Sequence, residues 1–246
     1  MSQVQGGEGR RLIGTLTDDE LVAFDPSGET ALTPSLTRFP DVDRGFVRLA
    51  GMRSLLARGL LVPTGDDEGP SFDVEPGPEL LELLAATSGG LAVVRALSVE
   101  EPVTAARTFR ALAPDHGVED DVSLVGVHVL STLGTDLALE RLVAWCLPDA
   151  VGPTGGRPRR IRIQDWPAVV RDELGPGARV VRVELAAEGH TDGFVVATGH
   201  DLALVVTTPD DDSAQVACTD HAALLQTLHG ALRRALDHHD RPEVPA

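Results

Sequence analysis

The chain has 246 residues, of which 42% are hydrophobic and 24% are charged, a composition typical of a globular protein with a sizeable core. It carries 38 Asp and Glu residues against 21 Lys and Arg, so its formal net charge is -17. Such an acidic chain repels nucleic acid and anionic lipid, and no stretch reaches the ~18 consecutive apolar residues that a membrane span needs. We therefore expect neither nucleic acid nor a membrane as a partner. The N-terminal residues lack a basic region followed by an apolar run, which predicts a cytoplasmic protein.

The first predicted elements are helical. Residues 1–12 show no periodic pattern, and we expect them to be disordered. Residues 18–24 predict a short helix. A longer helix follows, which Asp41 or Asp43 can cap and which ends at Arg58-Gly59. Its expected apolar face consists of five side chains spaced three or four residues apart: Phe46, Leu49, Met52, Leu56 and Leu60.

From about residue 71 onward, one order of elements occurs twice. Each copy has an extended segment, a helix begun by proline, a glycine stop and a Val-Val-Arg strand. Proline presets φ in the first helical turn, and glycine accepts the left-handed conformation past the last turn. Matching positions are 89 residues apart at the prolines, 87 at the strands and 84 at the later Thr-Asp helix starts. The first-copy positions are Pro78, Val93 and Thr135, and their counterparts are Pro167, Val180 and Thr219.

Short β-branched runs fill the space between the Val-Val-Arg strands and the Thr-Asp helix starts. These runs are separated by turn residues and predict antiparallel strands joined by hairpins. In the first copy they cover 104–112 and 122–130, with a polar turn at 114–117. In the second copy they cover 193–198, 202–208 and 214–218. An amphipathic helix closes each copy.

These patterns predict an α+β fold in which a duplicated unit, related by a quasi-twofold axis, forms a central antiparallel β-sheet flanked by helices. The expected divisions are a disordered segment 1–12, a first half 13–147, a Pro/Gly linker 148–158 and a second half 159–246. The second half contains the C-terminal helix and a short tail.

No catalytic or cofactor motif is found. The glycine-rich spots lack the spacing and the flanking strand and helix of a phosphate-binding loop. Cys146 and Cys218 are expected to be reduced thiols, as is usual in a cytosolic protein. The pair His238-His239 could bind a metal together with Asp237 and Asp240, but histidines there also complement a helix C-terminus. We therefore expect no cofactor, no metal and no enzymatic activity.

Two other function classes stay open. The helix that carries Arg44, Arg48, Arg53 and Arg58 could be the recognition helix of a winged-helix regulator, although the wing tip at 66–68 is acidic. Alternatively, a duplicated enzyme could hold an acid/base site in a crevice between its halves. Its candidate groups are His128, His190, Asp192 and His200.

Residues 49–61, which end in Arg-Gly-Leu-Leu, and 74–84, with the motif Pro-x-Leu, resemble the N-terminal half of the EspG family. Members of this family are chaperones associated with ESX (type VII) secretion. The resemblance extends over roughly residues 40–236 and includes chain length. The lack of Lys, Asn and Tyr is typical of GC-rich actinobacterial codon usage, and this family is actinobacterial.

The resemblance implies a cytosolic chaperone that holds paired α-helical secretion substrates before export, with a homodimer as a further option. It supplies no motif that identifies the binding surface. On physical grounds we expect the contact residues in or beside the duplicated strands, among aromatic side chains, which make up only 3% of the chain, and arginines, both suited to binding. These candidates are Arg107, Phe109, Arg110, Trp166 and Phe194.

Overall fold

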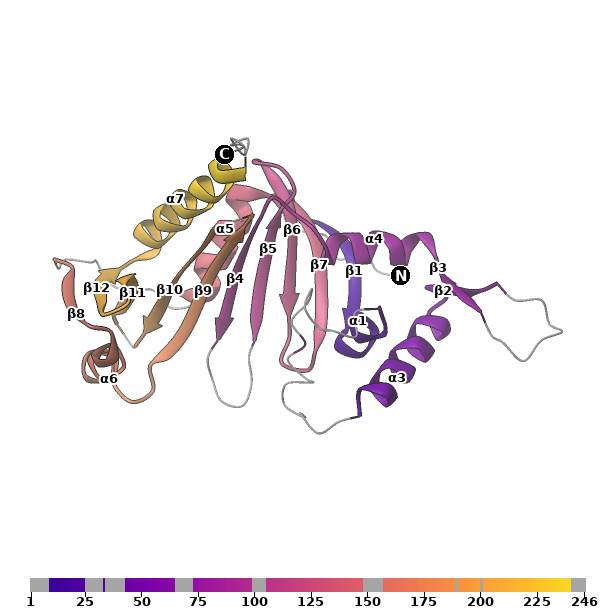
Figure 1. Cartoon of the computed structure of the whole chain (residues 1–246), viewed down its shortest axis with the longest axis horizontal. Coiled ribbons are helices and arrows are strands. Elements are labelled where there is room, and N and C mark those ends of the chain that lie inside the picture. The colour runs from indigo at the N-terminus through magenta and orange to yellow at the C-terminus, as the bar shows by residue number, and fades with distance from the viewer. Residues whose placement is uncertain are drawn as a thin grey trace, which may run out of the picture. The chain divides into compact units, whose positions relative to one another are not determined.

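The computed structural model describes residues 9–24, 33, 43–64, 73–98, 105–147, 157–188, 190–199 and 201–239, with only the backbone at 238–239. The fold is α+β, and the pairings of its long strands are antiparallel (Figure 1). The chain forms two compact units, one of Met1–Gly89 with Val118–Thr132 and one of Gly90–Gly117 with Leu133–Ala246. This division differs from the halves expected from the sequence, because a strand near the N-terminus pairs with Val127–Gly134. Residues 148–156 of the expected linker and 1–8 of the expected disordered segment lie outside the described residues.

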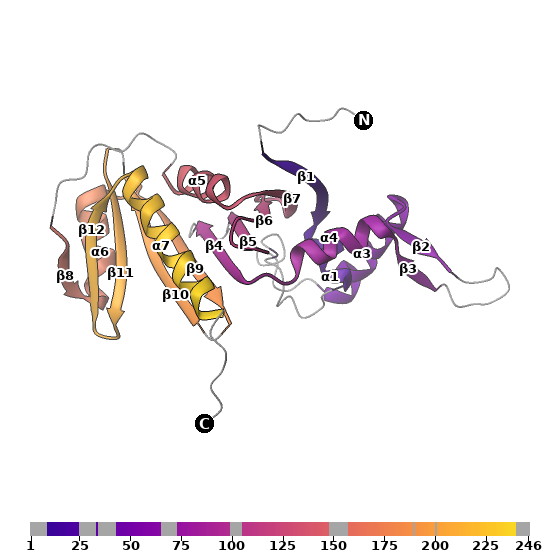
Figure 2. The same ribbon diagram turned by 90° about the horizontal axis from the view of Figure 1, so that it is seen from above.

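In its described residues, the first unit combines three helices with two sets of strands (Figure 2). Its elements are β1 (Arg11–Thr17), α1 (Asp18–Phe24), α3 (Arg44–Ala57), β2 (Leu61–Pro63), β3 (Val74–Pro76), α4 (Pro78–Thr87), most of β6 (His116–Val122) and most of β7 (Val127–Gly134). The short strands β2 and β3 pair with each other, while β7 lies between β6 and β1. The core of this unit contains Leu16, Leu55, Leu80, Leu83 and Leu130.

Strand β1 begins inside the segment expected to be disordered. Arg11 lies opposite Thr132 of β7, and Leu12 lies opposite Ser131. This order comes from pairing with a strand more than a hundred residues away, which no local pattern near the N-terminus could indicate.

Helix α3 begins and ends where the sequence predicts but turns a different face inward. Asp43 is the N-cap, and its side chain accepts a hydrogen bond of 2.7 Å from the Gly45 amide. Val47, Gly51 and Leu55 are buried, whereas Phe46 and Leu49 of the expected apolar face are 72% and 45% exposed. Leu60 of the expected face is buried, and Met52 and Leu56 pack, partly buried, against the same core. The predicted face is therefore confirmed for these three residues and wrong for Phe46 and Leu49.

Glycine 51 explains the orientation of α3. A Cβ atom at this position would lie 2.0 Å from the Asp19 carbonyl oxygen of α1. Only glycine permits the two backbones to approach so closely, and this approach directs the 47/51/55 side of α3 toward α1.

The strand assignments between 112 and 134 also need correction. The sequence predicted a polar turn at 114–117 and one strand over 122–130, but β6 covers His116–Val122 and a turn at 123–126 separates it from β7. Strand β6 contains buried Glu119 and Asp120, residue types that strands normally disfavour. Arg10 lies 3.6 Å from Glu119, and His128 lies 3.1 Å from Asp120, so ion pairs compensate the buried charges.

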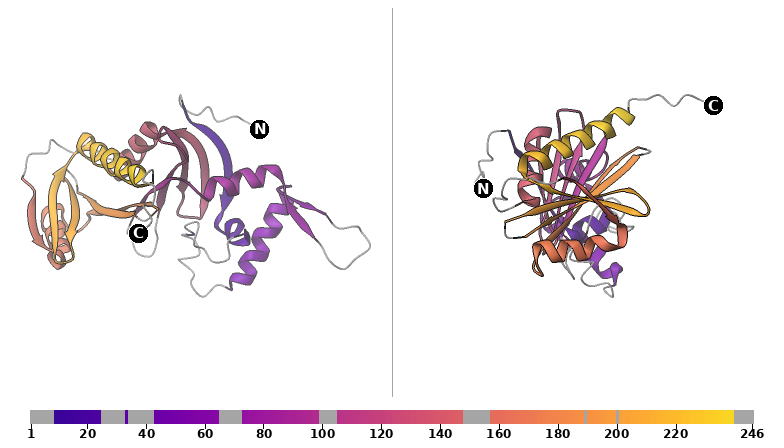
Figure 3. Two further views of the ribbon diagram at one scale, coloured as in Figure 1. Left: turned by 45° about the horizontal axis from the view of Figure 1, so that its top comes forward. Right: turned by 90° about the vertical axis from the view of Figure 1, so that its left-hand side faces the viewer.

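The second unit is one antiparallel sheet with helices on both faces (Figure 3). Its elements are β4 (Ala92–Ser98), β5 (Ala106–Ala111), α5 (Thr135–Cys146), β8 (Arg159–Arg162), η1 (Ile163–Asp165), α6 (Trp166–Leu174), β9 (Arg179–Ala187), β10 (His190–Thr198), β11 (Ala203–Asp210), β12 (Ser213–Thr219) and α7 (His221–His239). The strand order is β5-β4-β9-β10-β11-β12-β8. Strand residues alternate between two cores: Val196 packs with α5 and α7, whereas Ala197 packs with α6.

The order strand, helix, four strands, helix occurs twice, first from β3 to α5 and again from β8 to α7. Helices α4 and α6 carry proline in their first turn as predicted, and Gly89 and Gly175, with φ of 86° and 87°, follow their ends. The predicted strands of the second copy are confirmed. The repeated order agrees with a duplication, which itself stays a prediction.

Candidate functional site

A hollow of about 550 Å³ opens on the sheet of the second unit. We call it the sheet hollow. Its lining comes from three neighbouring strands and the first residue of α6: Trp166, Arg182, Val183, Glu184, Ala186, Thr191, Asp192, Gly193, Phe194, Val195, Val206 and Thr208. This volume lies in the range of known concave binding sites, roughly 300–1,000 Å³. The hollow is therefore the first candidate for a functional surface.

Local sequence positions Trp166 at the hollow. The 3-10 turn η1 leads into α6, and Pro167 in the first helical turn restricts the backbone beside the tryptophan. The side chain is half-buried and packs against the core beneath α6. Part of its surface consequently stays available for contact, as is common for interface tryptophans.

The sheet alternation supplies charge to the hollow. Val181, Val183 and Leu185 of β9 are buried in the core with α5 and α7, so the side chains of Arg182 and Glu184 lie on the other face. Arg182 Nε lies 2.9 Å from Glu184 Oε1, and Arg95 Nη1 of β4 lies 4.0 Å from Glu184 Oε2. Gly193 is the cross-strand partner of Glu184 and brings no side chain of its own. The result is a polar ridge beside apolar lining.

The hollow brings together two of the five residues predicted to bind a partner. Trp166 and Phe194 both line it, although Phe194 is only 6% exposed and packs mainly in the core with α5 and α7. The other three, Arg107, Phe109 and Arg110, belong to β5. The positions of the five residues in the sequence could not show which of their side chains lie on the same surface.

Strand β5 turns its predicted residues to two different faces. Phe109 is 1% exposed in the core with α5 and α7, and Arg107 donates a hydrogen bond of 3.1 Å to the Arg141 carbonyl of α5. Arg110 is 4% exposed and, by strand alternation, lies on the other side of the sheet. The burial of Phe109 and Arg110 corrects the expectation that they offer an exposed contact surface.

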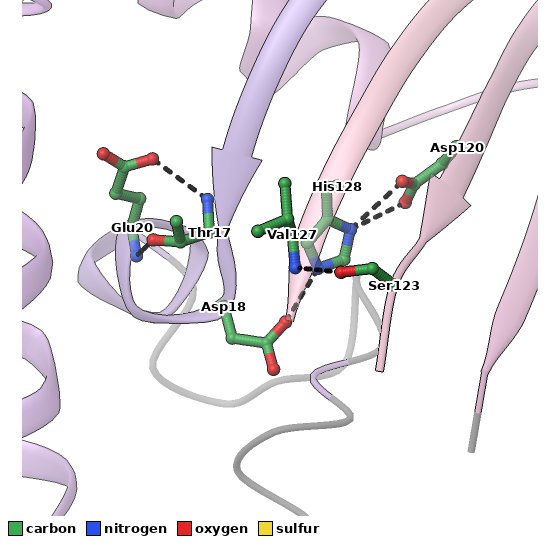
Figure 4. Close-up of polar contacts among 7 residues, drawn as sticks. All are labelled: Thr17, Asp18, Glu20, Asp120, Ser123, Val127 and His128. Carbon is green, nitrogen blue, oxygen red and sulfur yellow. Dashed lines mark hydrogen bonds and ion pairs between the residues drawn. The ribbon is translucent and has the colours of Figure 1, made fainter. Parts of the chain in front are cut away.

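The first unit contains a buried ionic cluster around His128 of β7 (Figure 4). Its Nε2 lies 2.9 Å from Oδ1 of Asp18, the first residue of α1. Its Nδ1 lies 3.1 Å from both carboxylate oxygens of Asp120 on β6. His128 is 0% exposed, and the two aspartates are 1% and 2% exposed. Three elements are thus joined through a single imidazole.

The two aspartates determine the charge state of His128. Burial alone would lower the pKa of this histidine, but hydrogen bonds to Asp120 and Asp18, reinforced by the two carboxylate charges, raise the pKa to about 9. At neutral pH the ring is an imidazolium that donates from both nitrogens. It has no free lone pair for a metal ion or for accepting a proton, so this cluster is suited to stabilising the fold.

A second network next to this cluster surrounds Glu20 of α1. Glu20 and Thr17 form a capping box: the Thr17 amide donates to Glu20 Oε2 at 3.0 Å, and the Glu20 amide donates to Thr17 Oγ1 at 3.3 Å. Ser54 Oγ donates to Glu20 Oε1 at 2.7 Å, and Arg58 Nη1 donates to Glu20 Oε2 at 2.6 Å. These bonds link α1 to the second half of α3 and its C-cap.

The acid/base groups proposed for an enzyme do not form a common cluster within either unit among the described residues. His128 is paired as above, while Asp192 accepts a hydrogen bond from Arg234 at 3.3 Å. His190 lies at the start of β10, and His200 lies outside the described residues. The side chains of His238 and His239 are also outside them, so the proposed metal pair cannot be placed. The described part of the chain holds no group of three or more His, Cys, Asp or Glu residues arranged for a metal ion.

Sequence reasoning missed Asp18 and Asp120, and it named His128 only as a crevice base. The Thr17-x-x-Glu20 motif was the available signal for the start of α1 and hence for the position of Asp18. Nothing local indicated Asp120, because its partner comes from the next strand.

Within the described residues, none of the helices is both long enough and apolar enough to cross a membrane. Comparisons with protein-family models and with curated proteins find no match for this chain.

Proposed function

We propose that this chain is a non-enzymatic protein-binding module of the cytoplasm, a chaperone that holds a helical type VII (ESX) secretion substrate over the sheet hollow. The observation that carries the proposal is the lining of this hollow, where the half-buried Trp166 lies with the Arg182–Glu184 ridge. A half-buried tryptophan beside ionic groups suits a helix that offers an apolar stripe and polar flanks. The resemblance of residues 49–61 and 74–84 to EspG chaperones supplies the substrate class.

The test blocks the hollow without disturbing the core. Thr208 lines the hollow and is exposed, so Thr208→Trp adds bulk there while leaving the buried strand residues in place. Leu112, 42% exposed in the same unit and outside this lining, provides the matched control Leu112→Trp. The full chain would be co-expressed with a paired helical ESX substrate of its own organism, and binding measured by calorimetry.

We expect Thr208→Trp to weaken binding by about tenfold or more, equivalent to ~1.4 kcal/mol, and Leu112→Trp to leave it unchanged. A second variant, Arg182→Glu, places like charge beside Glu184 and should weaken binding as well. Equal affinities for all variants would exclude the hollow as the substrate site. Absence of a complex with wild-type protein would reject the chaperone proposal.

A further inference from the structure

The outward face of α3 carries an uncommon combination of exposed apolar and cationic side chains. Phe46 is 72% exposed and Leu49 is 45% exposed, and Arg48 and Arg53 are exposed. Phe46, Leu49 and Arg53 are spaced i, i+3 and i+7, so they form a single stripe along the helix. We call these three residues the α3 stripe.

The packing of α3 forces this stripe outward. The close approach of Gly51 to the Asp19 carbonyl of α1 directs Val47, Gly51 and Leu55 inward, and the stripe lies on the opposite side of the helix. Rotating α3 to bury Phe46 would break this approach and bring Arg53 toward the core without a partner. The exposure of Phe46 is therefore built into the fold of the first unit.

Apolar exposure is concentrated in the same unit. Of the eight large hydrophobic side chains that are exposed among the described residues, seven belong to the first unit and only Leu112 belongs to the second. Among them, Phe46 and Leu49 are neighbours on one side of α3, and adjacent exposed hydrophobics are more typical of an interaction surface than isolated ones.

The charge of α3 is opposite to that of the chain as a whole. The chain has a net charge of -17, yet residues 44–62 contain four arginines and no Asp or Glu. Arg58 is paired with Glu20. Arg48 and Arg53 make no ion pair or hydrogen bond with any residue that the structure describes, although acidic residues outnumber cations in the sequence.

We propose that the α3 stripe is a docking surface for an acidic amphipathic helix of a partner protein. The apolar stripe of that helix would cover Phe46 and Leu49, and its Asp or Glu residues would pair with Arg53, which lies on the same side of α3. Phenylalanine and leucine offer nothing to a phosphate backbone, and the net charge repels a polyanion, so a protein partner fits better than nucleic acid. This surface is separate from the sheet hollow and does not depend on the function proposed there.

The test uses two synthetic helical peptides and the full chain. Both peptides carry one leucine stripe; in one the flanking residues are glutamates, and in the other they are lysines. We expect the glutamate peptide to bind and its affinity to fall with added salt. Arg53→Glu and Phe46→Ser should each weaken binding by about tenfold in fluorescence anisotropy. Arg53→Glu together with Arg48→Glu should instead favour the lysine peptide.

Matched controls exist for both substitutions. Arg171→Glu makes the same change of charge on exposed α6, and Leu81→Ser makes a similar loss of exposed apolar surface on α4, where Leu81 is 54% exposed. Both should bind the glutamate peptide like wild type, as should Thr208→Trp, which tests the hollow alone. Circular dichroism should show unchanged folding, because the substituted side chains are exposed.

Three results would overturn the proposal. The first is equal affinity for both peptides, or an equal loss of affinity for the glutamate peptide in Arg53→Glu and Arg171→Glu. The second is binding of a DNA duplex that Arg53→Glu abolishes while peptide binding is absent, which would assign the surface to nucleic acid. The third is self-association in sedimentation that Phe46→Ser abolishes without peptide binding, which would assign it to a second copy of the chain.

Discussion

Ala96 of β4 and Val183 of β9 lie opposite each other in the antiparallel ladder between these strands. They are 87 residues apart, which is also the spacing of the two Val-Val-Arg segments in the sequence. A twofold axis through this ladder would exchange the two strands, so equivalent positions of the two repeats would lie opposite each other on it. Ala96 and Val183 meet this requirement. Helices α5 and α7, which close the two copies, share the core on one face of this ladder. The pairing supports a duplication whose copies meet at β4 and β9.

This relationship predicts the outcome of a residue exchange. Ala96 and Val183 are both fully buried, so Val183→Ala leaves a cavity and Ala96→Val overpacks the same core, each costing about 1–3 kcal/mol. The double variant conserves volume and exchanges two equivalent positions, and it should recover most of the stability lost in the single variants. Urea unfolding of wild type, the two single variants and the double variant measures the coupling free energy between the two positions. Costs that simply add would show that the two side chains do not pack against each other in solution.

The His128 cluster predicts a loss of stability at alkaline pH. The pKa of His128 rises from 6.5 to about 9 on folding, so its contribution is fully present below pH 6.5 and is lost as pH rises through 9. The free energy of unfolding should fall by on the order of 3 kcal/mol between pH 6.5 and 9.5. Urea titrations across this range measure the fall.

His128→Gln supplies the control for that titration. It should be less stable than wild type at pH 6.5 and should show a much smaller further loss up to pH 9.5. Burial raises the pKa of the Cys146 thiol to about 12, and this adds a second loss only above pH 9. If the free energy of unfolding of wild type did not change between pH 6.5 and 9, this would contradict an imidazolium at His128.

Two helical glycines should respond to alanine in opposite directions. A Cβ at Gly51 would lie 2.0 Å from a backbone oxygen of α1, so Gly51→Ala should destabilise the protein by about 1–3 kcal/mol or more. At Gly230 of α7 the nearest atom is the end of the Arg234 side chain, 3.6 Å away. Gly230→Ala should therefore stabilise by about 0.5–1 kcal/mol, because alanine loses less entropy in a helix. Thermal unfolding of both variants checks the signs, and a neutral Gly51→Ala would refute the close α1–α3 approach.

The Glu20 network should show strong coupling between α1 and α3. The Glu20 side chain is fully buried, while that of Arg58 is 35% exposed, so removing the carboxylate leaves a partly buried cation without its partner. Glu20→Ala should cost on the order of 3 kcal/mol, and Thr17→Ala, which removes one bond of the capping box, about 1 kcal/mol. A double-mutant cycle of Glu20→Gln with Arg58→Met measures the pair itself. Additive effects in this cycle would show that the two side chains do not interact in solution.

Helix boundaries were predictable because their causes are local. Asp43 caps α3 by bonding two residues ahead, Pro78 begins α4, and Gly175 ends α6 in a conformation that favours glycine. The strands of the second copy were equally clear, because their β-branched runs are separated by short turns. These signals involve residues close together in the chain, so the α+β class and most of the element order could be read directly from them.

Strand β6 and the inward face of α3 could not be predicted in this way. Local propensity argues against a strand that contains Glu119 and Asp120, and ion pairs with Arg10 and His128, supplied by other segments, help to make their burial favourable. The apolar spacing of α3 suggested that Phe46 and Leu49 face inward, but the backbone contact at Gly51 outweighs it.

Which of the predicted contact residues share a surface likewise depended on contacts between segments distant in the chain. Composition identified Trp166 and Phe194 as scarce aromatic residues, but only the tertiary structure shows that Trp166 lines the hollow while Phe194 and Phe109 pack in the core with α5 and α7. The sequence by itself determined the fold class, the ends of the helices and the acidic charge, because these depend on neighbouring residues or on composition. Tertiary structure alone decided which charges are paired and which face of each element is exposed, because both depend on partners distant in the chain.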